Sequence, residues 1–127
     1  MERTARCCCG EAIIIVAGEP TLYGICHCDN CKQRTGSAFG MSAYFSEDQV
    51  VERKGRMGSY SIRDEQRRSF CSNCGTTLFW TSASQPDAIG IAAGCFTETP
   101  LPAPELSVSH EGKYDWITLP ERWSTQT

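Results

Sequence analysis

Nine cysteines, in three tight groups and one isolated position, constrain this 127-residue chain more than any other feature of its sequence. The segment GICHCDNCKQRTGSAF, residues 24–39, alone holds three of them together with one of the two histidines. The groups are Cys7-Cys8-Cys9-Gly10, Cys26-His27-Cys28-Asp29-Asn30-Cys31 and Cys71-Ser72-Asn73-Cys74-Gly75, with Cys95 alone. Thiols at such spacings form disulfides, redox pairs or metal sites, and the rest of the sequence has to decide among these.

The expected compartment favours metal ligation over disulfides. The N-terminal residues MERTARCCCG contain two arginines and no apolar stretch, so they do not resemble a signal peptide. The longest apolar run, AIIIVA at 12–17, is too short to span a membrane. We therefore expect a cytoplasmic location, where disulfides are rare, and an odd number of cysteines cannot pair completely. The net charge of -3 argues against a nucleic-acid-binding surface.

The length is typical of a single domain spanning residues 1–127, and 40% hydrophobic content is that of a globular protein. Short β-branched and aromatic segments separated by turn residues predict a mainly β fold with few short helical turns. Asp29 or Asn30 is expected to cap a short helix that Gly36 ends, and Ser46 with Gln49 predicts a capped turn. Strands are expected at 11–18, 21–28, 37–45, 58–62, 66–71, 76–82 and 88–96, with 58–62 and 66–71 forming a hairpin around Arg63-Asp64-Glu65. The proline-rich residues 99–105 predict an extended loop.

Two of the cysteine groups predict a structural zinc site. Cys71 and Cys74 form a C-x-x-C-G turn that can aim both sulfurs at one ion, and Gly75 can adopt the positive φ that directs backbone N–H groups toward sulfur. Cys7 and Cys9 supply a second pair, also followed by glycine. Two such pairs, distant in sequence, are the usual way to complete a tetrahedral four-sulfur zinc site.

The third group predicts a zinc site with an open position. Cys26, Cys28 and Cys31 offer three thiolates without an obvious fourth ligand, which is the pattern of catalytic zinc. We expect His27 to be half-buried beside the site, because alternation along an extended chain points its ring away from the two neighbouring cysteines. Cys8 is expected to face either core or solvent, and Cys95 to be a small buried residue.

The order of these motifs resembles that of the glutathione-dependent formaldehyde-activating enzyme family, which also includes centromere protein V. The matching stretches are C-x-C-G at 7–10, C-H-C-x-x-C with T-G-S-A-F at 26–39, F-C-x-x-C-G at 70–75 and, more weakly, SHEGKYDWITLPERW at 109–123. The chain departs from the common pattern at Lys32-Gln33, where Arg-Lys or Arg-Arg is usual. It departs again at Gly94-Cys95, where the family tends to have Gly-Ser-Leu-Asp.

The resemblance implies a zinc-bearing β-tent of short antiparallel sheets with two zinc ions per chain. One would be structural, on Cys7, Cys9, Cys71 and Cys74, and the other catalytic, on Cys26, Cys28 and Cys31. The family's reaction, of carbon–sulfur lyase type, is written as the addition of glutathione to formaldehyde to give S-hydroxymethylglutathione. We therefore expect a small-molecule thiol and an aldehyde as partners, with no nucleic acid and no membrane, and leave the oligomeric state open.

The chemistry of the ligands is consistent with that reaction. Three thiolates leave a zinc site negatively charged, so it is better suited to holding a nucleophilic thiolate than to generating hydroxide. An anionic thiol such as glutathione would need cations. Lys32 and Arg34 follow the three cysteines directly and Lys113 lies in the terminal motif, so these are the candidates for binding it, with Arg67 and Arg68 as further ones. Three alternatives remain: a non-catalytic zinc-binding module, a glutathione carrier, and a redox protein similar to methionine sulfoxide reductases with Cys95 as nucleophile.

Overall fold

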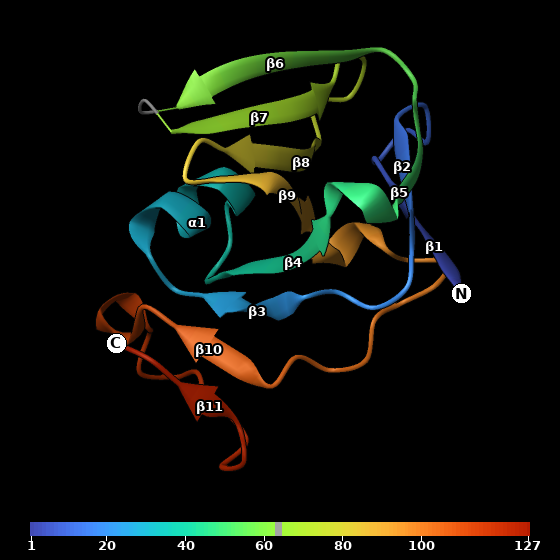
Figure 1. The fold of residues 1–127 in the computed structure, drawn as a ribbon. Coiled ribbons are helices and arrows are strands. Elements are labelled where there is room, and N and C mark those ends of the chain that lie inside the picture. The colour runs from blue at the N-terminus through green and yellow to red at the C-terminus, as the bar shows by residue number, and fades with distance from the viewer. Residues whose placement is uncertain (63–64) are drawn as a thin grey trace.

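Two β-sheets make up most of the computed structural model, which describes residues 1–62 and 65–127 (Figure 1). The smaller antiparallel sheet has the order β1-β2-β5, with β1 at Glu2–Arg6, β2 at Ile13–Ala17 and β5 at Val50–Lys54. The larger sheet has eight strands in the order β11-β10-β3-β4-β9-β8-β7-β6. Its strands are β3 (Leu22–Cys26), β4 (Gly40–Ser46), β6 (Met57–Ile62), β7 (Gln66–Cys71), β8 (Thr77–Ser82), β9 (Gln85–Ala92), β10 (Leu106–Val108) and β11 (Ser124–Thr125).

This architecture confirms the predicted fold class, a mainly β structure built from antiparallel sheets. One face of each central strand packs against a common core. Buried apolar residues alternate with more exposed residues along these strands, because successive side chains point to opposite faces. Ile14 and Val16 of β2, Phe45 of β4 and Ile89 and Ile91 of β9 are completely buried there. The core therefore lies between the two sheets and joins them.

The predicted elements agree with the structure except at some boundaries. The capping box of Ser46 and Gln49 is present around the 3-10 turn η1 (Glu47–Gln49), and β6 pairs with β7 as expected. Residues 63 and 64 of that predicted hairpin turn lie outside the described part of the chain. The strand predicted at 88–96 was wrong at its end, since it stops at Ala92 and the 3-10 turn η2 (Ala93–Cys95) follows.

Four strands of the two sheets, β1, β5, β10 and β11, were not predicted. The sequence of β1, ERTAR, is polar, and it forms a strand by antiparallel pairing with β2, with Arg3 buried and its guanidinium donating to Glu19 (2.8 Å). Strands β10 and β11 are too short to leave a pattern, and β10 pairs in parallel with both β3 and β11. These parallel pairs, in an otherwise antiparallel sheet, place the C-terminal residues alongside β3, as the orange and red ribbon in Figure 1 shows.

The N-cap of helix α1 (Asp29–Thr35) lies before both expected caps, Asp29 and Asn30. Cys28, rather than Asp29 or Asn30, is the N-cap, because its sulfur accepts the backbone N–H of Cys31 at 3.3 Å. Gly36 ends the helix with a φ of 65°, as predicted. Asn30 instead accepts a hydrogen bond from the buried Arg68 of β7 (2.9 Å), which ties α1 to the sheet. None of the described helices has the length and apolar character needed to cross a membrane.

Candidate metal centres

The first cluster of cysteines joins the two sheets. It consists of Cys7, Cys9, Cys71 and Cys74, whose sulfur atoms all lie within 4.8 Å of one another. The sulfur of Cys9 lies 3.6 Å from that of Cys7 and 3.7 Å from that of Cys71. A tetrahedral zinc ion with bonds of about 2.3 Å holds its sulfurs roughly 3.8 Å apart, whereas a disulfide joins them at about 2.05 Å. The spacing of this four-cysteine cluster therefore fits zinc.

Two similar turns present these sulfurs. Gly10 and Gly75, which follow the two cysteine pairs, both have a φ of +83°, as the C-x-x-C-G motif predicted for Gly75. Backbone N–H groups point at sulfur in each turn, from Ala12 to Cys7 (3.2 Å) and from Asn73 to Cys71 (3.4 Å). Hydrogen bonds from the Asn73 side chain and the Glu11 backbone lower the pKa of Cys9 below its usual value. These contacts favour the thiolate form that a metal requires.

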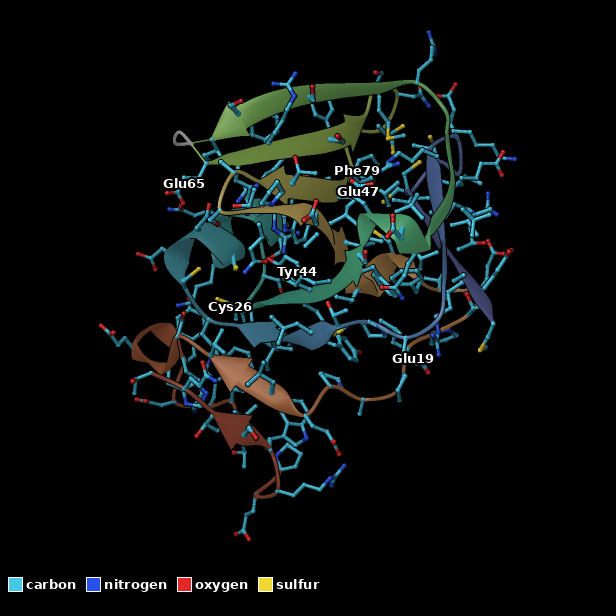
Figure 2. All side chains as sticks on the ribbon, viewed as in Figure 1. Glu19, Cys26, Tyr44, Glu47, Glu65 and Phe79 are labelled. Atoms are coloured by element: carbon cyan, nitrogen blue, oxygen red, sulfur yellow. The ribbon has the colours of Figure 1, made fainter. Side chains whose placement is uncertain are left out.

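The second cluster lies where β3 gives way to α1. Cys26 ends the strand, Cys28 caps the helix and Cys31 lies in the first helical turn, so that their sulfurs also lie within 4.8 Å of one another. All three residues are partly buried, and Figure 2 labels Cys26 beside α1. No fourth cysteine, histidine or carboxylate of the described residues joins this three-cysteine cluster. Such a donor set suits zinc with one position left for an exogenous ligand.

Cys26 and Cys31 influence each other's ionisation. A hydrogen bond with Cys31 lowers the pKa of Cys26, helped by the hydroxyl of Ser109 at 3.5 Å, and the same Cys26 contact raises the pKa of Cys31. Three thiolates at this separation repel one another, and a divalent cation among them removes that cost. The cluster is therefore an arrangement that binding of a soft cation would stabilise.

His27 lies outside the three-cysteine cluster, but it is completely buried rather than half-buried as expected. Its Nε2 atom hydrogen-bonds Ser107 Oγ of β10 at 2.9 Å, and the same hydroxyl meets Nε2 of His110 at 2.8 Å. Burial lowers the pKa of His27, and the neighbouring His110 lowers it further. Ser107 thus connects the two histidines. It fastens the C-terminal segment, which we define as residues 106–127, to the end of β3.

The three basic residues predicted to bind a thiol occupy different surroundings. Arg34 stacks its guanidinium on the Trp80 ring at 4.4 Å, and its Nη2 is buried without a hydrogen-bond partner among the described residues. Lys32 places its ammonium 3.9 Å from the centre of the Tyr114 ring. The Lys113 ammonium donates to the backbone carbonyl of Ile117 at 2.8 Å, so it also holds the C-terminal segment in place.

Close packing at two glycines maintains this arrangement. A β-carbon on Gly40 would lie 2.8 Å from Arg34 Nη2 and 3.0 Å from Cys31 Cβ. A β-carbon on Gly112, in the 3-10 turn η3 (His110–Gly112), would lie only 2.2 Å from the carbonyl oxygen of His27. The C-terminal segment can therefore lie directly against the strand–helix junction only because residue 112 has no side chain.

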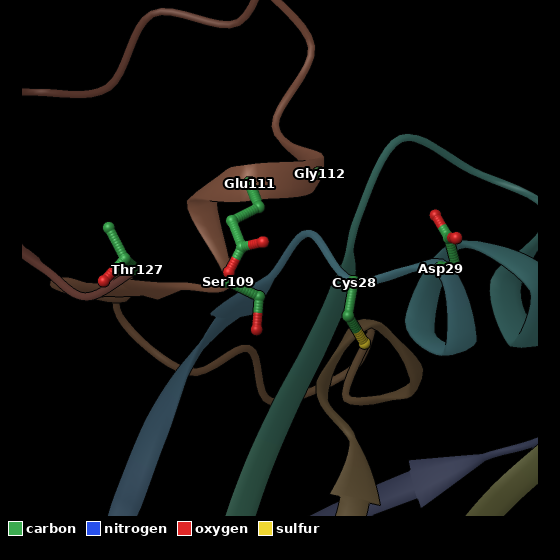
Figure 3. A pocket seen from close by; sticks show the side chains of 6 residues that line it. All are labelled: Cys28, Asp29, Ser109, Glu111, Gly112 and Thr127. Carbon is green, nitrogen blue, oxygen red and sulfur yellow. The ribbon is translucent and has the colours of Figure 1, made fainter.

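Two cavities of about 340 Å³ each adjoin the three-cysteine cluster. The first, which we call the acidic cavity, is lined by Cys28, Asp29, Ser109, Glu111, Gly112 and Thr127. In Figure 3, Ser109 and Glu111 of the C-terminal segment lie on one side of it and Cys28 and Asp29 on the other. The second, the neutral cavity, adjoins Cys26 and Cys31 and runs between β3, β4, β10 and the β8–β9 turn.

The neutral cavity is named for its lining. Its apolar walls are formed by Leu22, Ile25, Leu106 and Val108, with Gly24 between them. Hydroxyl and amide groups complete it, from Ser42, Tyr44, Gln66, Ser82, Ser84 and Gln85. Tyr44 is held by a hydrogen bond from Trp80 Nε1 at 3.3 Å, and Trp80 is in turn covered by Arg34. The two cavities thus reach the same cluster from sides of different polarity.

Comparison with known proteins identifies the family of this chain. The model of the family described as "Glutathione-dependent formaldehyde-activating enzyme" matches residues 2–111. The chain belongs to this family. The matched residues include all seven clustered cysteines, Lys32, Arg34 and His110, but not Lys113.

Two similar proteins extend the comparison. An uncharacterized lyase of Schizosaccharomyces pombe is 29% identical over 87 residues, which are 67% of this chain and 63% of that relative. A solved structure of a Rhodobacter sphaeroides protein superimposes with a TM-score of 0.60 over 80% of this chain and 92% of the other. Its sequence identity is 22%, so that likeness concerns the fold.

Sequence reasoning located the cysteines of both clusters but missed the serines around them. Ser107 and Ser109 contact His27 and Cys26, although about 80 residues separate each pair in the chain. Ser109 has a φ of 60°, which is uncommon for a residue other than glycine, and although it begins the stretch SHEGKYDWITLPERW, that stretch did not predict its contact with Cys26. Contacts of this kind depend on the pairing of β10 with β3.

We expect two zinc ions per chain that are held with unequal strength, because one cluster has four thiolates and the other three. A chelator should remove zinc from the three-cysteine cluster first while the circular dichroism spectrum persists. In Cys74→Ala, loss of the structural metal should cost more than about 4 kcal/mol of unfolding free energy, measured with urea. One zinc per chain under every loading condition, or a fully stable Cys74→Ala protein, would contradict these assignments.

Cys95 should behave as an inert core residue. Burial raises its pKa to about 11, and it packs against the core beside the four-cysteine cluster. Since the thiolate is the reactive form, alkylation of the zinc-loaded protein at pH 7 should label exposed Cys8 well before Cys95. Cys95→Ser should cost about 1 kcal/mol of stability and keep both zinc ions. Mass spectrometry that finds Cys95 labelled as fast as Cys8 would overturn this view.

Gly112→Ala should loosen the C-terminal segment, because the new methyl group would collide with the His27 carbonyl. We expect a loss of roughly 1–3 kcal/mol, typical of overpacking, and faster hydrogen exchange at the His27 amide, which bonds to Val108. Gly94→Ala is the matched control, since nothing lies within 4 Å of a β-carbon there. Equal stability and exchange in the two variants would show that the close approach does not matter.

Proposed function

We propose that this chain is a zinc-dependent enzyme of carbon–sulfur lyase type that adds a thiol reversibly to a small aldehyde. The thiol would be glutathione or a similar compound, and the aldehyde formaldehyde or a relative of it. The observation that carries this proposal is the three-cysteine cluster, which has no fourth protein ligand among the described residues and adjoins two cavities. Membership of the family supports it independently.

The reaction balances without any further reactant. The thiol sulfur forms a bond to the carbonyl carbon, the carbonyl π electrons move to oxygen, and the oxygen takes up the proton that the thiol loses. The reverse reaction breaks the carbon–sulfur bond and returns thiol and aldehyde. Zinc bound by Cys26, Cys28 and Cys31 would supply an open position at which a thiol ionises without losing its nucleophilicity.

The protein's own groups would position the reactants. Ser109 contacts Cys26 and lines the acidic cavity, so it can both orient that ligand and meet a bound molecule. Arg34 lies against Cys31 and raises the positive potential beside an otherwise anionic cluster. Lys32 lies close to Gly112 at the rim of the acidic cavity and is available to a carboxylate of the thiol. Lys113 would act through the segment that it fastens rather than by direct contact.

The redox alternative is not supported by the surroundings of Cys95. A methionine sulfoxide reductase-like mechanism needs an accessible thiolate, whereas this thiol is partly buried and has a raised pKa. A glutathione carrier or a non-catalytic zinc module would use the same three-cysteine cluster, and kinetics separate them from an enzyme.

Cys28→Ala should lower glutathione-dependent formaldehyde consumption by roughly 100-fold or more, since it removes a proposed zinc ligand. Its circular dichroism spectrum should stay close to that of the wild type, because the four-cysteine cluster is intact. Cys8→Ala is the matched control, an exposed cysteine outside both clusters that should keep wild-type rates. Initial rates have to be corrected for the uncatalysed addition.

Equal corrected rates of formaldehyde consumption for Cys28→Ala and the wild type would reject the proposed enzymatic function. Glutathione binding that depends on Cys28, measured by calorimetry, without any acceleration of aldehyde consumption would instead identify a carrier.

A further inference from the structure

We infer that the aldehyde of this enzyme is larger than formaldehyde and uncharged, and that its carbon chain occupies the neutral cavity. The inference rests on the proposed function and specifies its second substrate. It follows from the size of that cavity, from its uncharged lining and from the charged side chains that line the other cavity of the three-cysteine cluster.

The size of the cavity exceeds what formaldehyde needs. A water molecule in the liquid occupies about 30 Å³, so 340 Å³ corresponds to roughly ten such molecules. Formaldehyde has only two heavy atoms. Cys26 and Cys31 line the neutral cavity, so a molecule that fills it contacts the proposed reaction centre directly.

The lining selects an uncharged group. Apart from the two cysteines, the described residues that line the cavity carry aliphatic, hydroxyl or amide side chains and no carboxylate, ammonium or guanidinium. Transfer of an unpaired charge into such surroundings is costly, whereas burial of an apolar chain between Leu106, Val108 and Ile25 is favourable. Tyr44 and Ser42 can still hydrogen-bond a hydroxyl or carbonyl oxygen there.

Charged side chains line the cavity on the other side of the cluster, whereas the one guanidinium near the neutral cavity, that of Arg34, lies behind Cys31 and Trp80 and does not line it. Asp29 and Glu111 line the acidic cavity at Cys28, and the Lys32 ammonium lies near Gly112 of the same cavity. A thiol peptide that carries both ammonium and carboxylate groups, as glutathione does, therefore finds partners of both signs on this side. The thiol part of the adduct would therefore lie in the acidic cavity at Cys28. The carbon chain of the aldehyde would lie in the neutral cavity at Cys26 and Cys31.

Unreactive thioethers test this division by binding alone. Calorimetry on the zinc-loaded protein would compare S-methylglutathione, S-benzylglutathione and S-(4-carboxybenzyl)glutathione. We expect the benzyl compound to bind roughly tenfold more tightly than the methyl compound, because a phenyl ring becomes buried in the neutral cavity. The carboxybenzyl compound should lose that gain.

A charge introduced into the cavity should alter this order. Ser84 lies in the exposed β8–β9 turn and lines the neutral cavity, so Ser84→Lys should fold normally and favour the carboxybenzyl over the benzyl compound. Ser84→Glu should disfavour the carboxybenzyl compound further. Ser37→Lys, at an exposed serine that does not line the cavity, is the control and should keep the wild-type order.

Kinetics provide the second readout. With glutathione as the thiol, kcat/KM for 3-phenylpropanal should exceed that for formaldehyde by about tenfold, for the same reason of apolar burial. Equal affinity for the methyl and benzyl thioethers, or a preference for formaldehyde, would overturn the inference while leaving the proposed function in place. Failure of all three thioethers to bind, together with no accelerated consumption of either aldehyde, would reject the proposed function and the inference with it.

Discussion

The convergence of four thiols from two sheets is the constraint on which the rest of the structure depends. Cys7 and Cys9 follow the first strand of the smaller sheet, while Cys71 and Cys74 form the turn between β7 and β8 of the larger one. A metal held there would link segments more than sixty residues apart and restrict the unfolded chain accordingly. The apolar core of both sheets lies beside this cluster, so packing and ligation stabilise the same junction.

The second cluster is held in place by contacts from outside its own segment. Its cysteines belong to a short strand–helix junction, and α1 has no buried residue of its own to hold it in place. External contacts replace that packing. The buried Arg68 bonds Asn30 from one side, and the C-terminal segment approaches His27 through Gly112 from the other. The three-cysteine cluster stays accessible to small molecules, because its residues line two cavities.

Local sequence determined much of this arrangement in advance. The cysteine spacings identified both groups of sulfurs, the C-x-x-C-G motif indicated the positive φ of Gly75, and Gly36 ended α1 where expected. The errors were local as well. Cysteine sulfur is a weaker and less common N-cap than a carboxylate, so Cys28 was not predicted as the cap of α1. The apolar residues before Cys95 favoured a strand, whereas Ala93–Cys95 forms a 3-10 turn.

The sequence by itself therefore determined the donor groups of the two clusters and the class of fold, since ligand spacing and alternation of apolar residues are short-range properties. Only the tertiary structure decided what surrounds them. The parallel pairing of β10 with β3 brings Ser109 and Glu111 to Cys26 and Cys28 and Ser107 to His27, and residues of the β8–β9 turn line one cavity together with Cys31. These contacts join residues far apart in the chain, and their energy comes from packing and hydrogen bonds that form only when both sheets are assembled.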